Sequence, residues 1–269
     1  MRRALSKRAH LIGCALFVFL ALLSPPRLFA QPCLPPVIDE YATVRYVHDG
    51  DTLHLTDGRK LRFIGINTPE LARDDLPQEP YAVEARQYVR GLLPTGSRIG
   101  LVYGTEREDR HGRVLAHIVL ADGSSLNRRM LEHGYAQYIA VPPNLRQLSC
   151  YRQAEREARK AGLGVWQFDH HKLHHSENVS GKERGFHLLR GRIMRIDESK
   201  KYIWLNLDGP IALRIRRRDL HYFDVAELAS WSGRYVEARG WIYQRKGQQL
   251  MGIRHPASLV FMGKRDWDK

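Results

Sequence analysis

Cysteine is scarce in this sequence, and long apolar runs are confined to one place. Of three cysteines, only Cys33 and Cys150 lie beyond residue 30, so the rest of the chain allows at most one internal disulfide. No segment after Leu23 is apolar for long enough to span a bilayer, which excludes a further transmembrane helix. Hydrophobic residues make up 43% of the chain and charged residues 27%, which excludes a fibrous or wholly disordered protein.

Acidic residues are also in short supply, with 29 Asp and Glu against 43 Lys and Arg and a formal net charge of +14. A basic surface attracts polyanions, so nucleic acid and anionic membranes are the two partner classes to consider. A basic surface that serves only solubility is the alternative, and charge alone does not separate these readings.

The first 30 residues have the pattern of a secretory signal. Basic residues precede an apolar run from Leu11 to Leu23, and the helix-breaking residues 24–26 follow it. We predict cleavage after Ala30 and an exported protein, periplasmic or secreted, with no stable membrane association after cleavage. An uncleaved membrane anchor is the alternative. Removal of the signal takes away five positive charges and no negative ones, leaving +9.

Export changes the interpretation of the cysteines, because compartments outside the cytoplasm are oxidising. The two remaining thiols predict a Cys33–Cys150 disulfide. Closing a loop of more than ~100 residues would stabilise the fold by about 4 to 5 kcal/mol in the chain-entropy model.

Residues 31–166 are predicted to form one domain of short strands with helices. Alternating apolar and polar residues predict strands, joined first by a hairpin turn at residues 56–59. The predicted strands are Ala42–Leu55, Lys60–Ile66, Arg98–Tyr103 and Val114–Leu120. Helices are predicted after Pro80, after an N-cap at Ser124, and from about Cys150 to Ala161. The expected fold is mainly β with α, a closed five-stranded barrel of the OB type.

Residues 167–185 are predicted to be a His-rich linker, and residues 186–262 a second small β-barrel, also OB-like. The strands expected there are Leu188–Arg195, Tyr202–Leu207, Ile211–Ile215, Tyr235–Tyr243 and Gln249–Ile253, with a helix at Asp224–Trp231. This segment holds 14 Lys and Arg against 7 Asp and Glu. Arginines mixed with aromatic residues suit single-stranded nucleic acid, and a solvated basic face over an aromatic core is the alternative.

The linker contains two pairs of histidines, at residues 170–171 and 174–175. A spacing of four residues would place His pairs on one helical face, as in a transition-metal site. A solvated tract without a ligand is the favoured interpretation, because no carboxylate or thiol completes the set.

Four short motifs could together carry phosphodiester chemistry, which requires charge neutralisation on phosphate oxygens, an attacking water and a stabilised leaving oxygen. Taken singly, each has a structural explanation as a turn or as an arginine at a barrel rim. They are Asp49-Gly50-Asp51-Thr52, Arg62 among apolar strand residues, Asn67-Thr68-Pro69-Glu70, and Asp109-Arg110-His111-Gly112-Arg113.

Together these motifs resemble, in order and local spacing, the staphylococcal (micrococcal) nuclease or thermonuclease family, over residues 42–166. The ending from Glu155 to Trp166 is similar to that family's final helix. The resemblance implies a hydrolase: a calcium-dependent endonuclease that cuts phosphodiester bonds of DNA and RNA, leaves 3′-phosphate products and prefers single strands.

The resemblance also implies a role for each matching residue. Asp51 corresponds to the carboxylate that binds Ca²⁺, and Thr68 to the residue whose carbonyl binds it. Glu70 corresponds to the residue that orients or deprotonates the water. Arg62 and Arg113 correspond to the two guanidiniums that grip the phosphate, a task for which arginine's rigid fork is better suited than lysine.

The sequence departs from the family pattern in two places. Asn67 stands where the family has a second metal-binding aspartate; its amide oxygen is still a suitable calcium ligand, with one negative charge fewer. The two nucleotide-contacting tyrosines of the family fall on about Ala140 and Pro142, so base contacts do not transfer to Tyr135 or Tyr138 nearby.

Two other function classes compete with a nuclease. A catalytically silent nucleic-acid-binding module on the same fold is the first, since fold does not guarantee activity. The presence of Asp51, Arg62, Glu70 and Arg113 argues against it. A protein that binds anionic envelope surfaces through its basic C-terminal half is the second. Neither alternative predicts metal-dependent hydrolysis.

Overall fold

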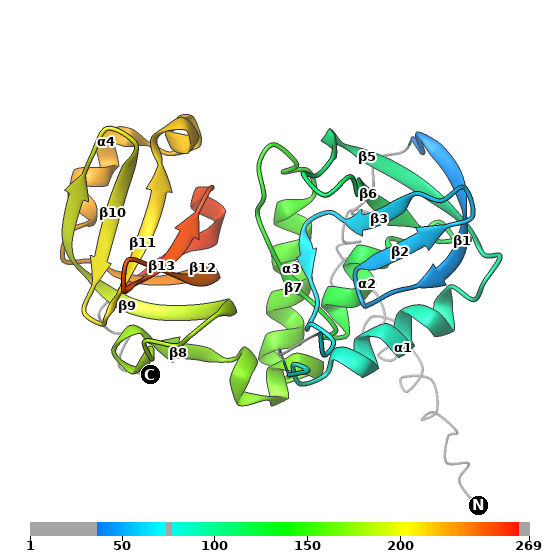
Figure 1. The fold of residues 1–269 in the computed structure, drawn as a ribbon, viewed down its shortest axis with the longest axis horizontal. Coiled ribbons are helices and arrows are strands. Elements are labelled where there is room, and N and C mark those ends of the chain that lie inside the picture. The colour runs from blue at the N-terminus through cyan, green and yellow to red at the C-terminus, as the bar shows by residue number, and fades with distance from the viewer. Residues whose placement is uncertain (1–36, 74–76, 264–269) are drawn as a thin grey trace, which may run out of the picture. The chain divides into compact units, whose positions relative to one another are not determined.

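The computed structural model describes residues 37–73 and 77–263. Within them the chain forms two β-barrels, the first blue to green and the second yellow to red in Figure 1. The predicted signal and Cys33 lie outside the described residues, so cleavage and the Cys33–Cys150 disulfide stay predictions. Among the described helices, none is long and apolar enough to cross a membrane.

The first barrel has five strands in the closed order β1-β2-β3-β6-β5. Strands β3 and β6 are parallel, and the other neighbours are antiparallel. This is the expected OB arrangement, in which the third and fifth barrel strands run side by side. Its strands are β1 (Glu40–Val47), β2 (Thr52–Leu55), β3 (Lys60–Phe63), β5 (Arg98–Glu108) and β6 (Val114–Val119), and a small outer pair is formed by β4 (Ile66–Asn67) and β7 (Gln137–Tyr138).

Three helices belong to this first part of the chain (Figure 1). Their apolar side chains add to the core of the barrel. The helices are α1 (Ala82–Leu92), α2 (Leu126–Glu132) and α3 (Leu148–Lys160). The helix predicted after Ser124 is capped one residue later, because the Ser125 hydroxyl accepts the Arg128 N–H at 3.2 Å. The Ser124 hydroxyl instead donates to Asp122 in the preceding turn.

The strand predicted over Ala42–Leu55 is interrupted, which corrects that prediction. The chain turns at residues 48–51, where the His48 N–H donates to the Thr52 carbonyl at 3.0 Å. The Asp49 carboxylate accepts the Asp51 N–H at 3.0 Å and closes the turn. Strands β1 and β2 therefore form a hairpin, and this turn holds part of the predicted site.

The second barrel repeats the topology of the first. Its five strands close in the order β9-β10-β11-β13-β12, with β11 and β13 parallel and β12 returning to β9. The strand predictions are confirmed, with two additional strands at its edges. The elements are β8 (Leu173–His175), β9 (Gly185–Glu198), β10 (Tyr202–Leu207), β11 (Ile211–Arg216), α4 (Val225–Leu228), β12 (Tyr235–Arg245), β13 (Gln248–Ile253) and β14 (Leu259–Met262), with short 3₁₀ helices at Arg217–Tyr222, Ala229–Trp231 and Pro256–Ser258.

The predicted His-rich linker contains regular structure. A 3₁₀ helix at Gly164–Gln167 leads into it, further 3₁₀ helices lie at Asp169–His171 and Ser176–Asn178, and β8 adds to the second barrel beside β9. No α-helix is found there, so the four-residue spacing of histidines does not place them on one helical face.

Candidate active site

Strand register places Asp51 against Arg62. Thr52 on β2 pairs with Arg62 on β3, and Asp51 directly precedes Thr52. The Arg62 guanidinium makes an ion pair with Asp51 through Nη1 and Oδ2, and only 12% and 6% of the two side chains are exposed. In this dry setting the pair orients both groups more strongly than it would at the surface.

A close approach of two turns brings Thr68 to the same carboxylate. The Thr68 backbone N–H donates to Asp51 Oδ2 at 2.9 Å. A Cβ on Gly50 would lie 2.8 Å from the Thr68 Cγ2 atom, inside van der Waals contact. Glycine at position 50 is therefore required for the approach, beyond its ordinary use in turns.

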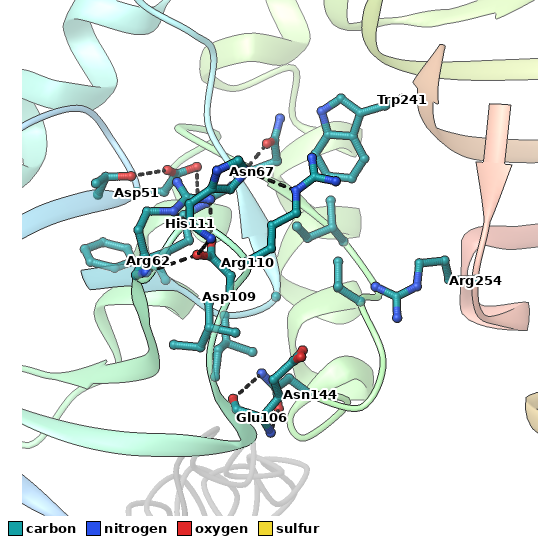
Figure 2. Close-up of a pocket in the computed structure, with 18 of the residues that line it drawn as sticks. Asp51, Arg62, Asn67, Glu106, Asp109, Arg110, His111, Asn144, Trp241 and Arg254 are labelled. Atoms are coloured by element: carbon teal, nitrogen blue, oxygen red, sulfur yellow. Dashed lines mark hydrogen bonds and ion pairs between the residues drawn. The ribbon is translucent and has the colours of Figure 1, made fainter. Parts of the chain in front are cut away.

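Asn67 completes this cluster from the outer strand pair. It ends β4 and pairs with Gln137 on β7. Its Oδ1 atom accepts a hydrogen bond from Arg62 Nη2 at 3.3 Å. Figure 2 shows the Asp51, Arg62 and Asn67 side chains gathered on one wall of the cleft. One guanidinium thus bridges the two side-chain oxygens that the sequence predicts as metal ligands.

A second aspartate, Asp49, adds negative charge beside Asp51. Burial and the charge of Asp51 together raise the pKa of Asp49 to about 7. Two buried carboxylates this close favour a cation between or beside them, because each disfavours ionisation of the other. The sequence motif contained Asp49, but its contribution to the field of the site emerges only from its burial.

Glu70 lies on the loop that follows Asn67. With 57% of its side chain exposed, it retains access to water. The cleft walls still displace part of that water, and together with the charge of Asp51 this raises the pKa of Glu70 above its usual value. Glu79 holds the loop: its Oε2 accepts the Glu70 N–H at 3.0 Å, and its own N–H donates to the Glu70 carbonyl at 2.9 Å.

Arg113 enters from the hairpin between β5 and β6. Asp109 fixes it, accepting the Arg113 N–H at 3.0 Å and its Nε–H at 2.8 Å. Burial alone would raise the pKa of Asp109, but hydrogen bonds from the backbone N–H groups of Arg113 and His111 and from the Arg113 guanidinium lower it. The sequence predicted Arg113 but not this orienting role of Asp109.

Five of the six predicted residues line one cleft of about 1140 Å³: Asp51, Arg62, Asn67, Glu70 and Arg113. Thr68 contributes through its backbone contact to Asp51. The cleft exceeds the ~300–1,000 Å³ common for small-molecule sites, which suits a larger ligand. Side chains from the second barrel also line it: Arg214, Arg216, Arg218, Trp241, Tyr243 and Arg254. The basic run of the sequence signalled those arginines but not their location.

The three metal ligands predicted from the sequence would all supply oxygen atoms. Within residues 37–73 and 77–263, no three His, Cys, Asp or Glu side chains are arranged to hold a metal. The predicted ligand set is not a cluster of that type, because it consists of one carboxylate, one amide oxygen and one backbone carbonyl. Oxygen ligands of these kinds are the ones that Ca²⁺ prefers. The Arg62 guanidinium lies against the oxygen atoms of both Asp51 and Asn67 and places positive charge beside them.

The two nearby tyrosines serve structure. Tyr138 is buried, and its hydroxyl donates to the Ala257 carbonyl of the second barrel at 2.7 Å. Tyr135 stacks on Tyr81 and Tyr88, with ring centroids 5.4 Å and 4.3 Å away. Neither tyrosine lines the cleft, so neither supplies a base contact.

Comparison with known proteins matches the first barrel and its helices. A family model described as staphylococcal nuclease homologue matches residues 60–168. The thermonuclease of Staphylococcus intermedius is 35% identical over 127 residues, which cover 46% of this chain and 74% of that protein. The thermonuclease of Staphylococcus hyicus is 32% identical over 129 residues, covering 47% of this chain and 75% of that protein. Endonuclease YhcR of Bacillus subtilis is 30% identical over 148 residues, 51% of this chain but 12% of that protein.

The segment matched by the family model begins at β3 and runs through the rest of the first barrel and its three helices, and it carries Arg62, Asn67, Glu70 and Arg113. The fold, the arrangement of these side chains and the extent of the match to the two thermonucleases agree. The chain therefore belongs to the staphylococcal nuclease family of hydrolytic enzymes.

Proposed function

We propose that this protein is an exported, calcium-dependent nuclease that hydrolyses phosphodiester bonds of both DNA and RNA. Unpaired strands are the preferred substrate, and 3′-phosphate ends are the product. The observation that carries the proposal is the convergence of Arg62, Arg113 and Glu70 on one cleft with the Asp51 cluster. Two fixed cations and an accessible carboxylate are the groups that hydrolysis of a phosphodiester requires.

Asp51, Asn67 and the Thr68 carbonyl would hold the calcium ion. The fit rests on the oxygen atoms of these three residues and on the buried carboxyl groups of Asp49 and Asp51, of which Asp51 is paired with Arg62. When bound, the ion supplies positive charge beside the phosphate. Because Asn67 is neutral, the site carries one negative charge fewer than it would with aspartate there.

The two arginines neutralise the phosphate oxygens as the fifth bond to phosphorus forms. Arg113 is held for this by Asp109, whose Oδ2 atom lies 2.8 Å from both Nε and Nη2, so the Nη1 side of the guanidinium is left for substrate. Arg62 must exchange its contacts with Asp51 and Asn67 for the phosphate. The same movement of Arg62 would free the oxygen atoms of Asp51 and Asn67 to hold the cation.

Glu70 serves as the general base. It accepts a proton from water while the water oxygen bonds to phosphorus and the bond from phosphorus to the 5′ oxygen breaks. The leaving oxygen takes a proton from solvent, and the phosphate stays on the 3′ oxygen. Glu79 supports this role by holding the backbone of Glu70 in place.

Release of acid-soluble nucleotides from heat-denatured DNA, duplex DNA and RNA tests the proposal. We expect release from all three, fastest from denatured DNA, and loss of release with a calcium chelator that added Ca²⁺ restores. Binding without release in the presence of calcium would instead favour a catalytically silent module. Release that persists in chelator would remove calcium from the proposal.

Export is proposed from the pattern of residues 1–30. Fractionation of cells should then place a shortened chain in the periplasm or the medium. In that compartment we predict a Cys33–Cys150 disulfide. Mass spectrometry of the unreduced protein, digested and compared with a reduced sample, should find the two cysteine peptides linked. Alkylation of both thiols without prior reduction would contradict the prediction.

A further inference from the structure

Arg214 in the second barrel occupies the position that Arg62 occupies in the first. Each lies on the third strand of its barrel, on the face turned away from the core, between two core residues. Each strand runs parallel to the fifth strand, with Arg62 opposite Leu115 and Arg214 opposite Gly252. Both arginines line the same cleft. In OB folds, the face of the second and third strands is the surface that binds oligonucleotides.

The surroundings of the two arginines differ in a way that indicates binding without chemistry. Arg62 contacts Asp51, whereas Arg214 lies over the rings of Tyr202 and Tyr243, 4.4 Å and 5.0 Å from their centroids. The Arg214 Nε atom is buried with no hydrogen-bond partner among the described residues. A buried N–H without a hydrogen-bond acceptor destabilises the protein. A hydrogen bond from this N–H to an anion in the cleft would offset that cost.

Arg254 repeats this feature nearby. Its Nε atom is also buried without a hydrogen bond, at 4.0 Å from Asp219, while its Nη2 donates to the Pro142 carbonyl of the first barrel at 2.9 Å. That bond fixes the guanidinium at the cleft, and Figure 2 shows Arg254 reaching toward it from the second barrel. Two arginines with unused donors on one wall match a run of phosphates better than a single small anion.

An aromatic side chain and an open slot lie next to these arginines. Trp241 on β12 is 42% exposed and lines the cleft. Its indole is held by the edge of Phe186, with ring centroids 5.0 Å apart. Between the strands of Trp241 and Arg214 runs β13 with Gly252, where a Cβ would meet no atom within 4 Å. A base can therefore enter beside the indole.

We propose that this face of the second barrel is a subsite for single-stranded nucleic acid: Arg214 and Arg254 bind phosphates flanking the scissile one, and Trp241 stacks on an unpaired base above Gly252. The inference rests on the proposed function, since it assumes a nucleic-acid substrate at Arg62 and Arg113. Stacking requires an unpaired base, so the subsite also accounts for a preference for single strands.

Fluorescence anisotropy with a labelled oligo(dT) of about 12 nucleotides, within the range of OB-fold sites, tests the subsite in the full-length protein. A chelator present throughout prevents cleavage. Trp241→Ala should raise Kd about tenfold, as expected for loss of one base–aromatic stack. Trp241→Phe, which keeps a ring, should restore most of the affinity. Gly252→Leu should weaken binding similarly by filling the slot, at a position where an added Cβ meets no atom within 4 Å.

Two variants on the same barrel serve as controls. Met194→Ala removes an exposed apolar side chain outside the cleft, and Arg195→Gln removes an exposed arginine to match Arg214→Gln. Arg214→Gln should raise Kd about fivefold, and the controls should leave it unchanged. Equal affinities of Trp241→Ala and Met194→Ala would overturn the subsite. Because the readout needs no cleavage, failure of hydrolysis would count against the proposed function alone.

Discussion

At the scale of single residues, the site depends on how burial changes ordinary side chains. Asp51, Arg62 and Asn67 form a cluster with little water, in which each polar atom is oriented by another. Glu70 differs from them because it remains in contact with solvent. This division suits the proposed roles, since ligands and clamps benefit from rigidity and a general base requires access to water.

Glu70→Gln should lower kcat by about 10² or more, because a general base accounts for roughly 10²–10⁴ in rate. The amide keeps the shape of the side chain, and folding should survive. Single-turnover cleavage of denatured DNA measures the effect on the chemical step. Glu84→Gln, on α1 outside the cleft, is the matched control. Near-normal turnover of Glu70→Gln would show that the proposed base is wrong.

His117 should make stability depend on pH. It is buried in the first barrel and its Nδ1 lies 2.7 Å from the Tyr151 hydroxyl. Burial lowers the pKa of His117 to about 4. In the unfolded chain His117 takes up a proton near pH 6.5, whereas in the folded chain it does so only near pH 4. The contribution of neutral His117 to the free energy of unfolding is therefore fully present above pH 6.5 and is lost as pH falls toward 4. From pH 7 to 5 the loss is about 2 kcal/mol.

Urea unfolding at pH 7 and pH 5 measures this loss. The comparison with His117→Gln isolates the contribution, because glutamine keeps a polar partner for Tyr151 but does not titrate in this range. The variant should be less stable at pH 7 and should lose less free energy of unfolding on acidification. An identical pH dependence in both proteins would rule out His117 as the source.

At the scale of elements, α3 and β12 are joined by a network of ion pairs, one of which is buried. Arg239 on β12 donates from Nη1 to both carboxylate oxygens of Glu155 on α3, at 2.9 Å and 2.7 Å. Both side chains are nearly inaccessible. Arg159 and Glu237 continue the alternation, with Nη1 and Oε1 2.9 Å apart. These contacts link the first barrel's last helix to the second barrel.

Arg239→Ala should therefore destabilise the protein by about 3 to 5 kcal/mol, because it leaves the Glu155 carboxylate buried without a counter-charge. Arg217→Ala, which removes an exposed partner of Glu198, should cost less than about 1 kcal/mol. Chemical denaturation measures both. Adding Glu155→Gln to Arg239→Ala should recover part of the loss, since the charge is then absent. No recovery in the double variant would mean that lost packing, and not charge, dominates.

At the scale of the whole molecule, the positive charge is concentrated on the segment that lines the cleft from the second barrel. Arg214, Arg216 and Arg218 all lie along this wall. Charge on a cleft wall steers a polyanion toward the site and is screened by salt. The second barrel thus has a physical means of contributing to substrate capture without supplying the carboxylates needed for chemistry.

A triple variant in which Arg214, Arg216 and Arg218 are each replaced by Gln tests this. If each arginine contacts a phosphate, the slope of the logarithm of the binding constant against the logarithm of salt concentration should become less steep by about 2 for single-stranded DNA. A triple variant of exposed arginines outside the cleft, at Arg156, Arg195 and Arg217, gives the same change in net charge. Titrations at several salt concentrations in chelator compare the two. Equal slopes would show that only net charge matters.

The sequence by itself determined most of the strands and helices, and it predicted the candidate site residues. Strand alternation and turn residues predicted most strands of both barrels, because local periodicity is set by which side chains must face a core. The order of Asp51, Arg62, Glu70 and Arg113 resembles that of the staphylococcal nuclease family, and this resemblance carried the prediction of the chemistry. Local signals failed at the turn of residues 48–51, where hydrogen bonds of Asp49 and Thr52 interrupt an alternating pattern.

Only the tertiary structure decided which distant residues share the cleft. The pairing of Arg62 with Asp51 follows from strand register, and the fixing of Arg113 by Asp109 follows from the hairpin geometry. Trp241 and Arg254 lie more than a hundred residues from the motifs, and nothing in their local sequence indicates where they point. The physical reason is that a local pattern reports only which residues of one segment are buried. Closure of a barrel and pairing of buried charges bring together segments that are far apart in the sequence, and no local pattern records those contacts.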